Sequence, residues 1–127
     1  MGRILLVEDD NHRRSWFGNR FTDHELDTTD DVAVAVEWLS SREYDLIFLD
    51  HDLALEHYAQ EMADDGLTGY VVASWLAEHP ECQPDCEIII HSLNFSGSAR
   101  MQQCLENAGR KAEHVPFPYL PALFPAS

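Results

Sequence analysis

The sequence predicts an α/β protein, a three-layer sandwich in which helices cover both faces of a parallel sheet. Short aliphatic runs alternate along the chain with segments whose apolar residues recur at helical spacing. This alternation is typical of parallel strands joined by right-handed crossover helices. The runs at 4–7, 46–49 and 88–90 are continuously apolar, as expected of strands that are buried on both faces.

Each expected element has its own signal in the sequence. Asp10 or Asn11 offers a cap for a first helix. Asp30 or Asp31 offers a cap for the second. The third helix ends before Pro80, because proline cannot continue a helix. The expected strands are 4–7, 25–29, 44–49, 87–90 and 112–115, and the expected helices are 11–21, 32–41, 67–78 and 96–105.

The length and composition fit a single globular domain. The chain has 127 residues, of which 45% are hydrophobic, and this is enough to build one full core. Its formal net charge is −15, which argues against nonspecific nucleic-acid binding and against a membrane-surface role. An odd number of cysteines, 3, does not suggest a disulfide framework. With no leader and no apolar stretch near the roughly 18 residues of a membrane span, we expect a cytoplasmic protein.

Reactive side chains follow three of the expected strands at the point where each strand ends. The three clusters are Glu8-Asp9-Asp10, Asp50-His51-Asp52 and His91-Ser92-Leu93-Asn94. In an open parallel sheet, ligands bind beyond the carboxyl ends of the strands. We therefore expect the three clusters to form one composite pocket.

The acidic residues of this pocket predict a divalent cation, Mg2+ or Mn2+. Burying several carboxylates costs several kcal/mol unless a cation or firm hydrogen bonds compensate. Carboxylate oxygens are the ligands that Mg2+ prefers. We expect Asp9 and Asp50 to bind it, with a backbone carbonyl near Asp52 and water molecules completing an octahedron.

These motifs resemble a response-regulator receiver domain, and most closely its variant called the cyclic-phosphate processing receiver domain. The matching stretches are Leu49-Asp50-His51-Asp52-Leu53, the segment 68–76, and His91-Ser92-Leu93-Asn94 with Gly97 and Met101. The resemblance implies a five-stranded sheet in the order 2-1-3-4-5, as in receiver and flavodoxin-like folds. It also implies a receiver-like domain over 1–117, followed by a proline-rich tail, 118–127, in place of the fifth helix.

The resemblance further implies roles for individual residues. In ordinary receivers a histidine kinase phosphorylates the residue at the position of Asp50, and an acidic pair, here Glu8 and Asp9, binds Mg2+. A Thr or Ser ends the fourth strand, and either His91 or Ser92 stands at that position here.

The fifth strand departs from the receiver pattern. Receivers carry a lysine there, in a Lys-Pro-Phe signature, and this chain has Val115-Pro116-Phe117 instead. The cation that would contact a phosphorylated Asp50 is therefore missing from its usual place. His114 and Lys111 lie nearby but not at the matching position.

Three functions are compatible with these residues, and the first is metal-dependent chemistry on a cyclic phosphate ester. His51 or His91 would act as general acid or base, because imidazole titrates near neutral pH. Ser92 and Asn94, with backbone N–H groups near Gly97, would bind the phosphate oxygens.

The second function is a signalling receiver in which Asp50 accepts a phosphoryl group from a histidine kinase or a small phosphodonor. The third is a catalytically silent pseudo-receiver that binds a partner.

The tail supports the third function if its apolar side chains are exposed. These are Tyr119, Leu120, Leu123 and Phe124. They form either an interface for a homodimer or a partner protein, or a layer folded back on or near the sheet, and we expect the second arrangement. The prolines of 116–125 are too many for a helix.

Several other residues have a plain structural interpretation. Arg13 and Arg14 are within reach of a phosphate, but we expect them to be solvated on a helix surface. Trp16, Trp38 and Trp75 are expected in the core. The long polar segment 53–66 is either a lid over the pocket or a surface loop.

Overall fold

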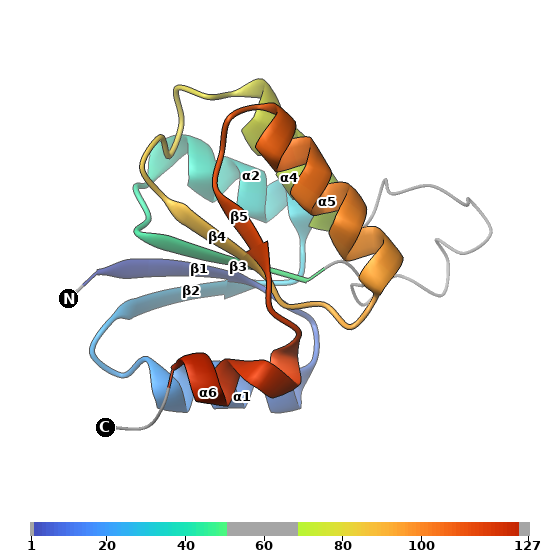
Figure 1. The fold of residues 1–127 in the computed structure, drawn as a ribbon. Helices are drawn as coiled ribbons and strands as arrows, with labels where there is room; N and C mark the ends of the chain where they lie inside the picture. Colours follow the sequence, from blue (N-terminus) through green and yellow to red (C-terminus); the bar gives the residue numbers. More distant parts are fainter. Residues whose placement is uncertain (1, 51–68, 125–127) are drawn as a thin grey trace.

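The computed structural model describes residues 2–50 and 69–124, which form one parallel sheet flanked by helices (Figure 1). The strands are β1 (Arg3–Val7), β2 (Glu25–Thr29), β3 (Leu46–Leu49), β4 (Glu87–Ile90) and β5 (Ala112–His114). The helices are α1 (Asn11–Arg20), α2 (Val32–Ser41), α4 (Gly69–Glu78), α5 (Phe95–Asn107) and α6 (Leu120–Leu123), with a 3-10 turn η1 (Phe117–Tyr119). The strand order β2-β1-β3-β4-β5 confirms the predicted fold.

The register of the sheet aligns the ends of three strands. Val7 pairs with Leu49 on the neighbouring strand, and Leu49 pairs with Ile90 on the next. The pairing continues one residue beyond, since the N–H of Asp50 donates to the carbonyl of Val7 and the N–H of His91 to that of Leu49. The reactive clusters after β1, β3 and β4 therefore meet at one edge of the sheet.

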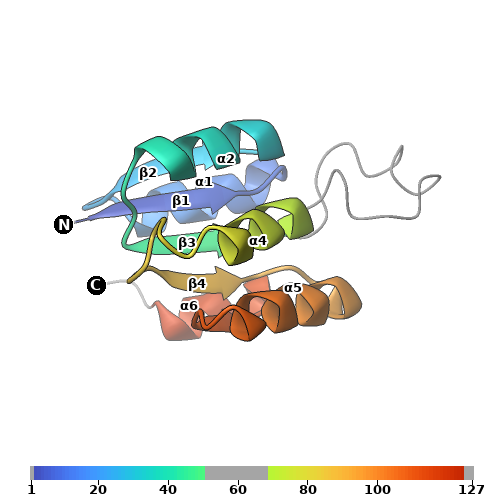
Figure 2. The ribbon, with the colours of Figure 1, turned by 90° about the horizontal axis from the view of Figure 1, so that it is seen from above.

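Helices cover the two faces of the sheet unequally (Figures 1 and 2). On one face α2, α4 and α5 enclose the larger core cluster, which includes Leu5, Val7 and Leu49. On the other face α1 and the tail enclose a smaller, aromatic cluster that includes Leu6 and Phe48. Alternate residues of each strand enter opposite clusters, as the pleat requires. Trp16, Trp38 and Trp75, which were expected in the core, are half-buried and pack against the edges of these clusters.

Capping side chains fix where the helices begin. The side chain of Asp10 accepts a hydrogen bond from the N–H of Arg13 and so caps α1. Asp31 caps α2, and Asn94 caps α5 by accepting from the N–H of Gly97. Of the alternative caps that the sequence offers, Asp10 rather than Asn11 caps α1, and Asp31 rather than Asp30 caps α2.

The tail contains helical turns, so the expectation that its prolines exclude a helix was wrong. Pro118 and Pro121 occupy the first turns of η1 and α6, where a helix does not need the missing N–H. Leu120 is fully buried in the aromatic cluster, whereas Tyr119 and Leu123 are exposed. A single helical turn thus packs beside α1. The domain boundary at residue 117 stays a prediction.

The segment that follows Asp50 lies outside the described residues. His51, Asp52 and the segment 53–66 are not among the described residues, so their expected roles stay predictions. None of the helices in the described part of the chain is both long enough and apolar enough to cross a lipid bilayer.

Candidate metal and phosphate site

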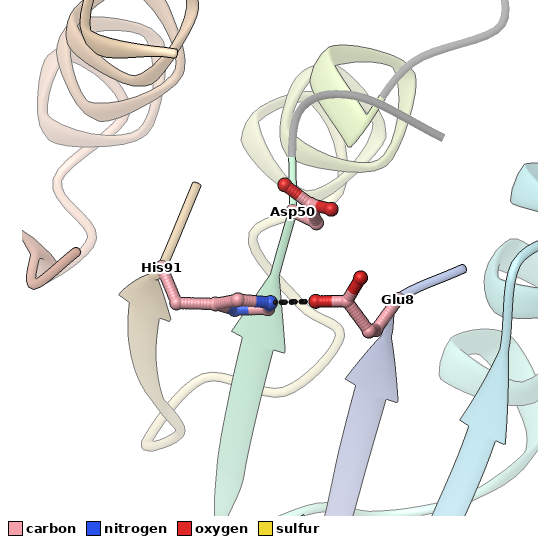
Figure 3. Close-up of side chains that lie close together, drawn as sticks. All are labelled: Glu8, Asp50 and His91. Carbon is pink, nitrogen blue, oxygen red and sulfur yellow. Dashed lines mark hydrogen bonds and ion pairs between the residues drawn. The ribbon is translucent and has the colours of Figure 1, made fainter. Parts of the chain in front are cut away.

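Three buried side chains meet at the carboxyl edge of the sheet (Figure 3). Glu8, Asp50 and His91 each stand one residue beyond a strand, and their ligand atoms all lie within 4.8 Å of one another. They share the strand parity of Leu6 and Phe48, so they point toward the face that α1 covers. The sheet register, rather than any loop, therefore brings the three groups together.

Glu8 is held by five hydrogen bonds. Its Oε1 accepts from Nε2 of His91 at 2.7 Å and from Nε of Arg13 at 3.0 Å. Its Oε2 accepts from Nη2 of Arg13 at 3.0 Å and from the N–H groups of Asp9 and Asp10 at 3.1 and 3.0 Å. Burial alone would raise the pKa of Glu8, but the bonds from His91 and Arg13 outweigh it and lower the pKa to about 2. Glu8 is thus a fixed anion with both oxygens in use.

His91 faces Glu8, and its side chain is excluded from solvent. Its ring packs against Phe17 and Phe48, at centroid distances of 5.3 and 6.2 Å. Burial lowers the pKa of His91, although the carboxylate of Glu8 opposes this. Nδ1 has no hydrogen-bond partner among the described residues, so a neutral ring with the proton on Nε2 leaves no N–H unsatisfied. The geometry favours a role for His91 in positioning Glu8.

Asp50 is buried, and one of its two carboxylate oxygens lacks a hydrogen-bond partner among the described residues. Its side chain is 4% exposed, and its Oδ2 makes no hydrogen bond within residues 2–50 and 69–124. The nearest cation is Nη2 of Arg13, 3.5 Å from Oδ2. Burial and the negative charge of Glu8 raise the pKa of Asp50 to about 8, against the opposing charge of Arg13. A buried carboxylate in this condition fits a bound cation.

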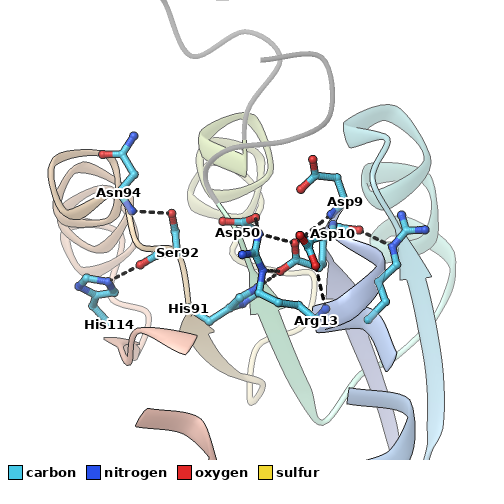
Figure 4. Close-up of polar contacts among 10 residues, drawn as sticks. Asp9, Asp10, Arg13, Asp50, His91, Ser92, Asn94 and His114 are labelled. Carbon is cyan, nitrogen blue, oxygen red and sulfur yellow. Dashed lines mark hydrogen bonds and ion pairs between the residues drawn. The ribbon is translucent and has the colours of Figure 1, made fainter. Parts of the chain in front are cut away.

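A pocket of about 270 Å3 opens over these groups (Figure 4). It is lined by Asp9, Asp10, Arg13, Asp50, His91, Ser92 and Leu93. Both oxygens of Glu8 already accept hydrogen bonds, and Oδ1 of Asp10 caps α1. The carboxylates of Asp9 and Asp50, which also line the pocket, are therefore the candidates to hold a metal. The pocket therefore fits a divalent cation with oxygen ligands.

Ser92 and Asn94 organise the turn between β4 and α5. The Oγ of Ser92 accepts from the N–H of Asn94 at 3.0 Å, and the Oδ1 of Asn94 accepts from the N–H of Gly97 at 2.9 Å. Nε2 of His114 lies 2.9 Å from the carbonyl oxygen of Ser92. Ser92 lines the pocket, whereas the side-chain oxygen of Asn94 is committed to the helix cap. His91, not Ser92, is the first residue after β4 and faces the acidic cluster.

Arg13 was expected on the solvated surface, and this expectation was wrong. The guanidinium binds both oxygens of Glu8 and lies beside Asp50, and its side chain is only 27% exposed. Arg14 also turns inward, since its Nε donates to the carbonyl of Glu8. The available signal was that Arg13 stands in the first turn of α1, where side chains point back toward the preceding strand end.

Comparisons with known proteins agree with this description. Residues 3–107 match the family model of the cyclic-phosphate processing receiver domain. No curated protein matches the sequence. The response regulator TrrA of Thermotoga maritima, solved with Mg(2+)-BeF, is 23% identical, with a TM-score of 0.65 over 91% of this chain and 86% of that one.

Two further solved structures share the fold at low identity. The receiver domain of sensor histidine kinase PA1611 from Pseudomonas aeruginosa, with magnesium in its active site cleft, is 20% identical, with a TM-score of 0.66 over 97% of this chain and 93% of that one. The chemotaxis protein CheY4 of Vibrio cholerae is 16% identical, with a TM-score of 0.66 over 97% and 95%. With the family match over 3–107, the chain belongs to the cyclic-phosphate processing receiver domain family.

Proposed function

We propose that the pocket binds a divalent cation together with a cyclic phosphate ester and opens the phosphate ring. The observation that carries the proposal is the buried Oδ2 of Asp50, which has no hydrogen-bond donor in the described part of the chain and shares a pocket with Asp9. Mg2+ is the favoured cation, because TrrA and the PA1611 receiver were both solved with magnesium. Mn2+ has similar oxygen preferences and is the alternative.

Asp9 and Asp50 would hold the cation, with the backbone near Asp52 as a further ligand. When bound, a divalent cation polarises a phosphate oxygen and lowers the pKa of a coordinated water. Glu8 would support the site without binding the cation, because its Oε2 accepts from the N–H groups of Asp9 and Asp10 and so holds the turn that carries Asp9.

The proton transfers would involve a histidine other than the buried one. His91 donates to Glu8 and is closed to solvent, so a direct proton transfer from its ring to a substrate is not supported by the geometry. We propose His51, next to Asp50 in the sequence, as general acid or base. Ser92 and the N–H groups at the start of α5 would bind phosphate oxygens.

The test is ring opening of cyclic phosphates, followed by 31P NMR. Purified protein with Mg2+ or Mn2+ is incubated with 2′,3′- and 3′,5′-cyclic nucleotides and with a cyclic phosphate that lacks a base. We expect turnover of at least one compound, abolished in Asp50→Asn and retained in Asp85→Asn, which alters an exposed carboxylate elsewhere. Absence of ring opening with either metal would contradict the proposal.

A second candidate function is phosphoacceptance by Asp50 within a phosphorelay, with a histidine kinase as partner. The same Oδ2, which has no hydrogen-bond partner among the described residues, favours it, since an acceptor carboxylate needs one oxygen open for attack. The test is addition of beryllofluoride with Mg2+ while amide NMR signals are recorded. Shifts at the residues around Asp50, lost in Asp50→Asn, would support phosphoacceptance. An unchanged spectrum would exclude it.

A further inference from the structure

We propose that Arg13 is the residue of this chain that contacts the phosphate oxygens of the bound ester. This assignment rests on the proposed function of the pocket. Of the described residues that line the pocket, Arg13 is the one cationic side chain, since burial lowers the pKa of His91. Figure 4 shows the Arg13 side chain reaching from α1 toward Asp50.

The hydrogen bonds of Arg13 leave part of its guanidinium available. A guanidinium carries five N–H donors. Nε and Nη2 donate to Glu8, each at 3.0 Å, and Nη2 lies 3.5 Å from Asp50. No hydrogen bond of Nη1 is found within residues 2–50 and 69–124. Nε and Nη2 of the guanidinium are thus anchored on a fixed anion, while the Nη1 amino group has no hydrogen-bond partner among the described residues and can donate to an anionic ligand.

The anchoring also prepares Arg13 for a phosphate. Glu8 is buried and ionised, and the guanidinium lies over the ring of Phe117 at 6.0 Å from its centroid. A side chain fixed in this way loses little conformational freedom when a ligand binds. Arginine forks match phosphate oxygens in geometry as well as in charge.

The other basic side chains near this edge of the sheet, His114 and Arg14, contact other groups. Nε2 of His114 contacts the carbonyl of Ser92, and the Arg14 guanidinium pairs with Glu8's carbonyl and Asp30. Val115, after β5, carries no charge. Among the described residues, the positive charge beside Asp50 therefore comes from Arg13 of α1.

The contacts available to Arg13 differ between the metal-free and the metal-bound pocket. In the metal-free protein its Nη2 lies beside Asp50, 3.5 Å from Oδ2. When a divalent cation compensates Asp50, the same guanidinium is available to a phosphate. This predicts opposite effects of removing Arg13: phosphate binds less tightly, while the metal binds at least as tightly because a competing cation is gone.

The experiment measures both affinities by titration calorimetry. Mg2+ is titrated first, and inorganic phosphate is then titrated at saturating Mg2+, with wild type, Arg13→Gln, Arg13→Lys and Arg14→Gln. We expect Arg13→Gln to weaken phosphate binding by about tenfold or more without weakening Mg2+ binding. Arg13→Lys should fall between, since lysine lacks the fork. Arg14→Gln, the neighbouring control, should match wild type.

Each other result overturns the assignment in a recognisable way. Unchanged phosphate affinity in Arg13→Gln, with wild type binding phosphate, overturns the role of Arg13 and leaves the proposed function intact. Loss of both affinities means that Arg13 only supports Glu8. A wild type that binds no phosphate with Mg2+ overturns the assignment together with the proposed function. Thermal unfolding verifies folding, and Arg13→Lys keeps the test valid if Arg13→Gln does not fold.

Discussion

Nε2 of His91 lies 2.7 Å from Oε1 of Glu8, and both side chains are excluded from solvent. The two residues follow β4 and β1, which are not neighbours, because β3 lies between them in the sheet. The hydrogen bond therefore spans the strand that ends at Asp50. It ties the three strand ends together directly below the pocket.

The first prediction concerns the protonation of His91. Its pKa is lowered in the folded protein, whereas the unfolded chain binds a proton below about pH 6.5. The stability that His91 contributes is therefore present above pH 6.5 and is lost as the pH falls toward the folded pKa. 15N NMR should show a neutral ring, protonated at Nε2, from pH 6.5 to 8.

A substitution checks the same bond. His91→Phe preserves packing against Phe17 and Phe48 but removes a donor to Glu8, and should cost about 1–3 kcal/mol in the free energy of unfolding at pH 7. The loss should shrink at pH 5 in urea unfolding. His12→Gln, on the exposed face of α1, should have no effect. An equal loss at both pH values would contradict the neutral ring.

The second prediction concerns Asp50 in the metal-free protein. Burial and Glu8 raise its pKa to about 8, far above the value of about 4 in an unfolded chain. The folded state therefore binds this proton more tightly, and the stability it brings is complete below about pH 4 and is lost as the pH rises toward 8. Asp50→Asn should stabilise the metal-free protein by roughly 1–3 kcal/mol at pH 8 and little at pH 4.5.

Thermal unfolding in EDTA at the two pH values measures this difference. Added Mg2+ should raise the melting temperature of wild type but not of Asp50→Asn. A variant that is less stable than wild type at pH 8 would show that the ionised carboxylate is well compensated without metal.

The third prediction follows for metal affinity. Because a bound cation must displace the proton of Asp50, Mg2+ should bind more tightly as the pH rises from 6 to 8, by about tenfold per pH unit. Calorimetry in two buffers of different ionisation enthalpy should detect the release of about one proton at pH 7. An affinity independent of pH would mean that Asp50 is already ionised or is not a ligand.

The sheet and the location of the pocket were predictable from sequence for a local reason. The runs 4–7, 46–49 and 88–90 are apolar and end abruptly in polar residues, and parallel pairing places such ends at one edge. A one-residue ambiguity between His91 and Ser92 remained, because only the register with Leu49 decides which side chain faces Glu8.

Arg13 and the tail could not be derived in the same way. The inward turn of Arg13 depends on an anion, Glu8, that is buried by other strands, and helical spacing alone does not report this. The number of prolines in the tail does not exclude helical turns, because Pro118 and Pro121 stand in the first turns, where proline is tolerated. Both errors concern tertiary contacts that override a local preference.

The fourth prediction uses two glycines with opposite surroundings. A Cβ at Gly69 would overlap the carbonyl oxygen of Asp50, whereas a Cβ at Gly18 meets nothing within 4 Å. Gly69→Ala should therefore displace the backbone of Asp50, lower the stability and weaken Mg2+ binding. Gly18→Ala, inside α1, should stabilise the protein by about 0.5–1 kcal/mol. Urea unfolding and Mg2+ titration of both variants test this, and unchanged Mg2+ affinity in Gly69→Ala would contradict the close approach.

The fifth prediction asks whether the tail is part of the core, and two leucines of α6 provide a matched pair. Leu120 is fully buried against the aromatic cluster, and Leu123 is 51% exposed. Leu120→Ala should lower the free energy of unfolding by about 2–4 kcal/mol, because it removes buried apolar surface and leaves a cavity. Leu123→Ala should cost less than about 1 kcal/mol. Urea unfolding measures both free energies. The two positions should differ only if the tail completes the core. Equal, small losses of stability would therefore mean that the sheet face beside α1 is stable without the tail.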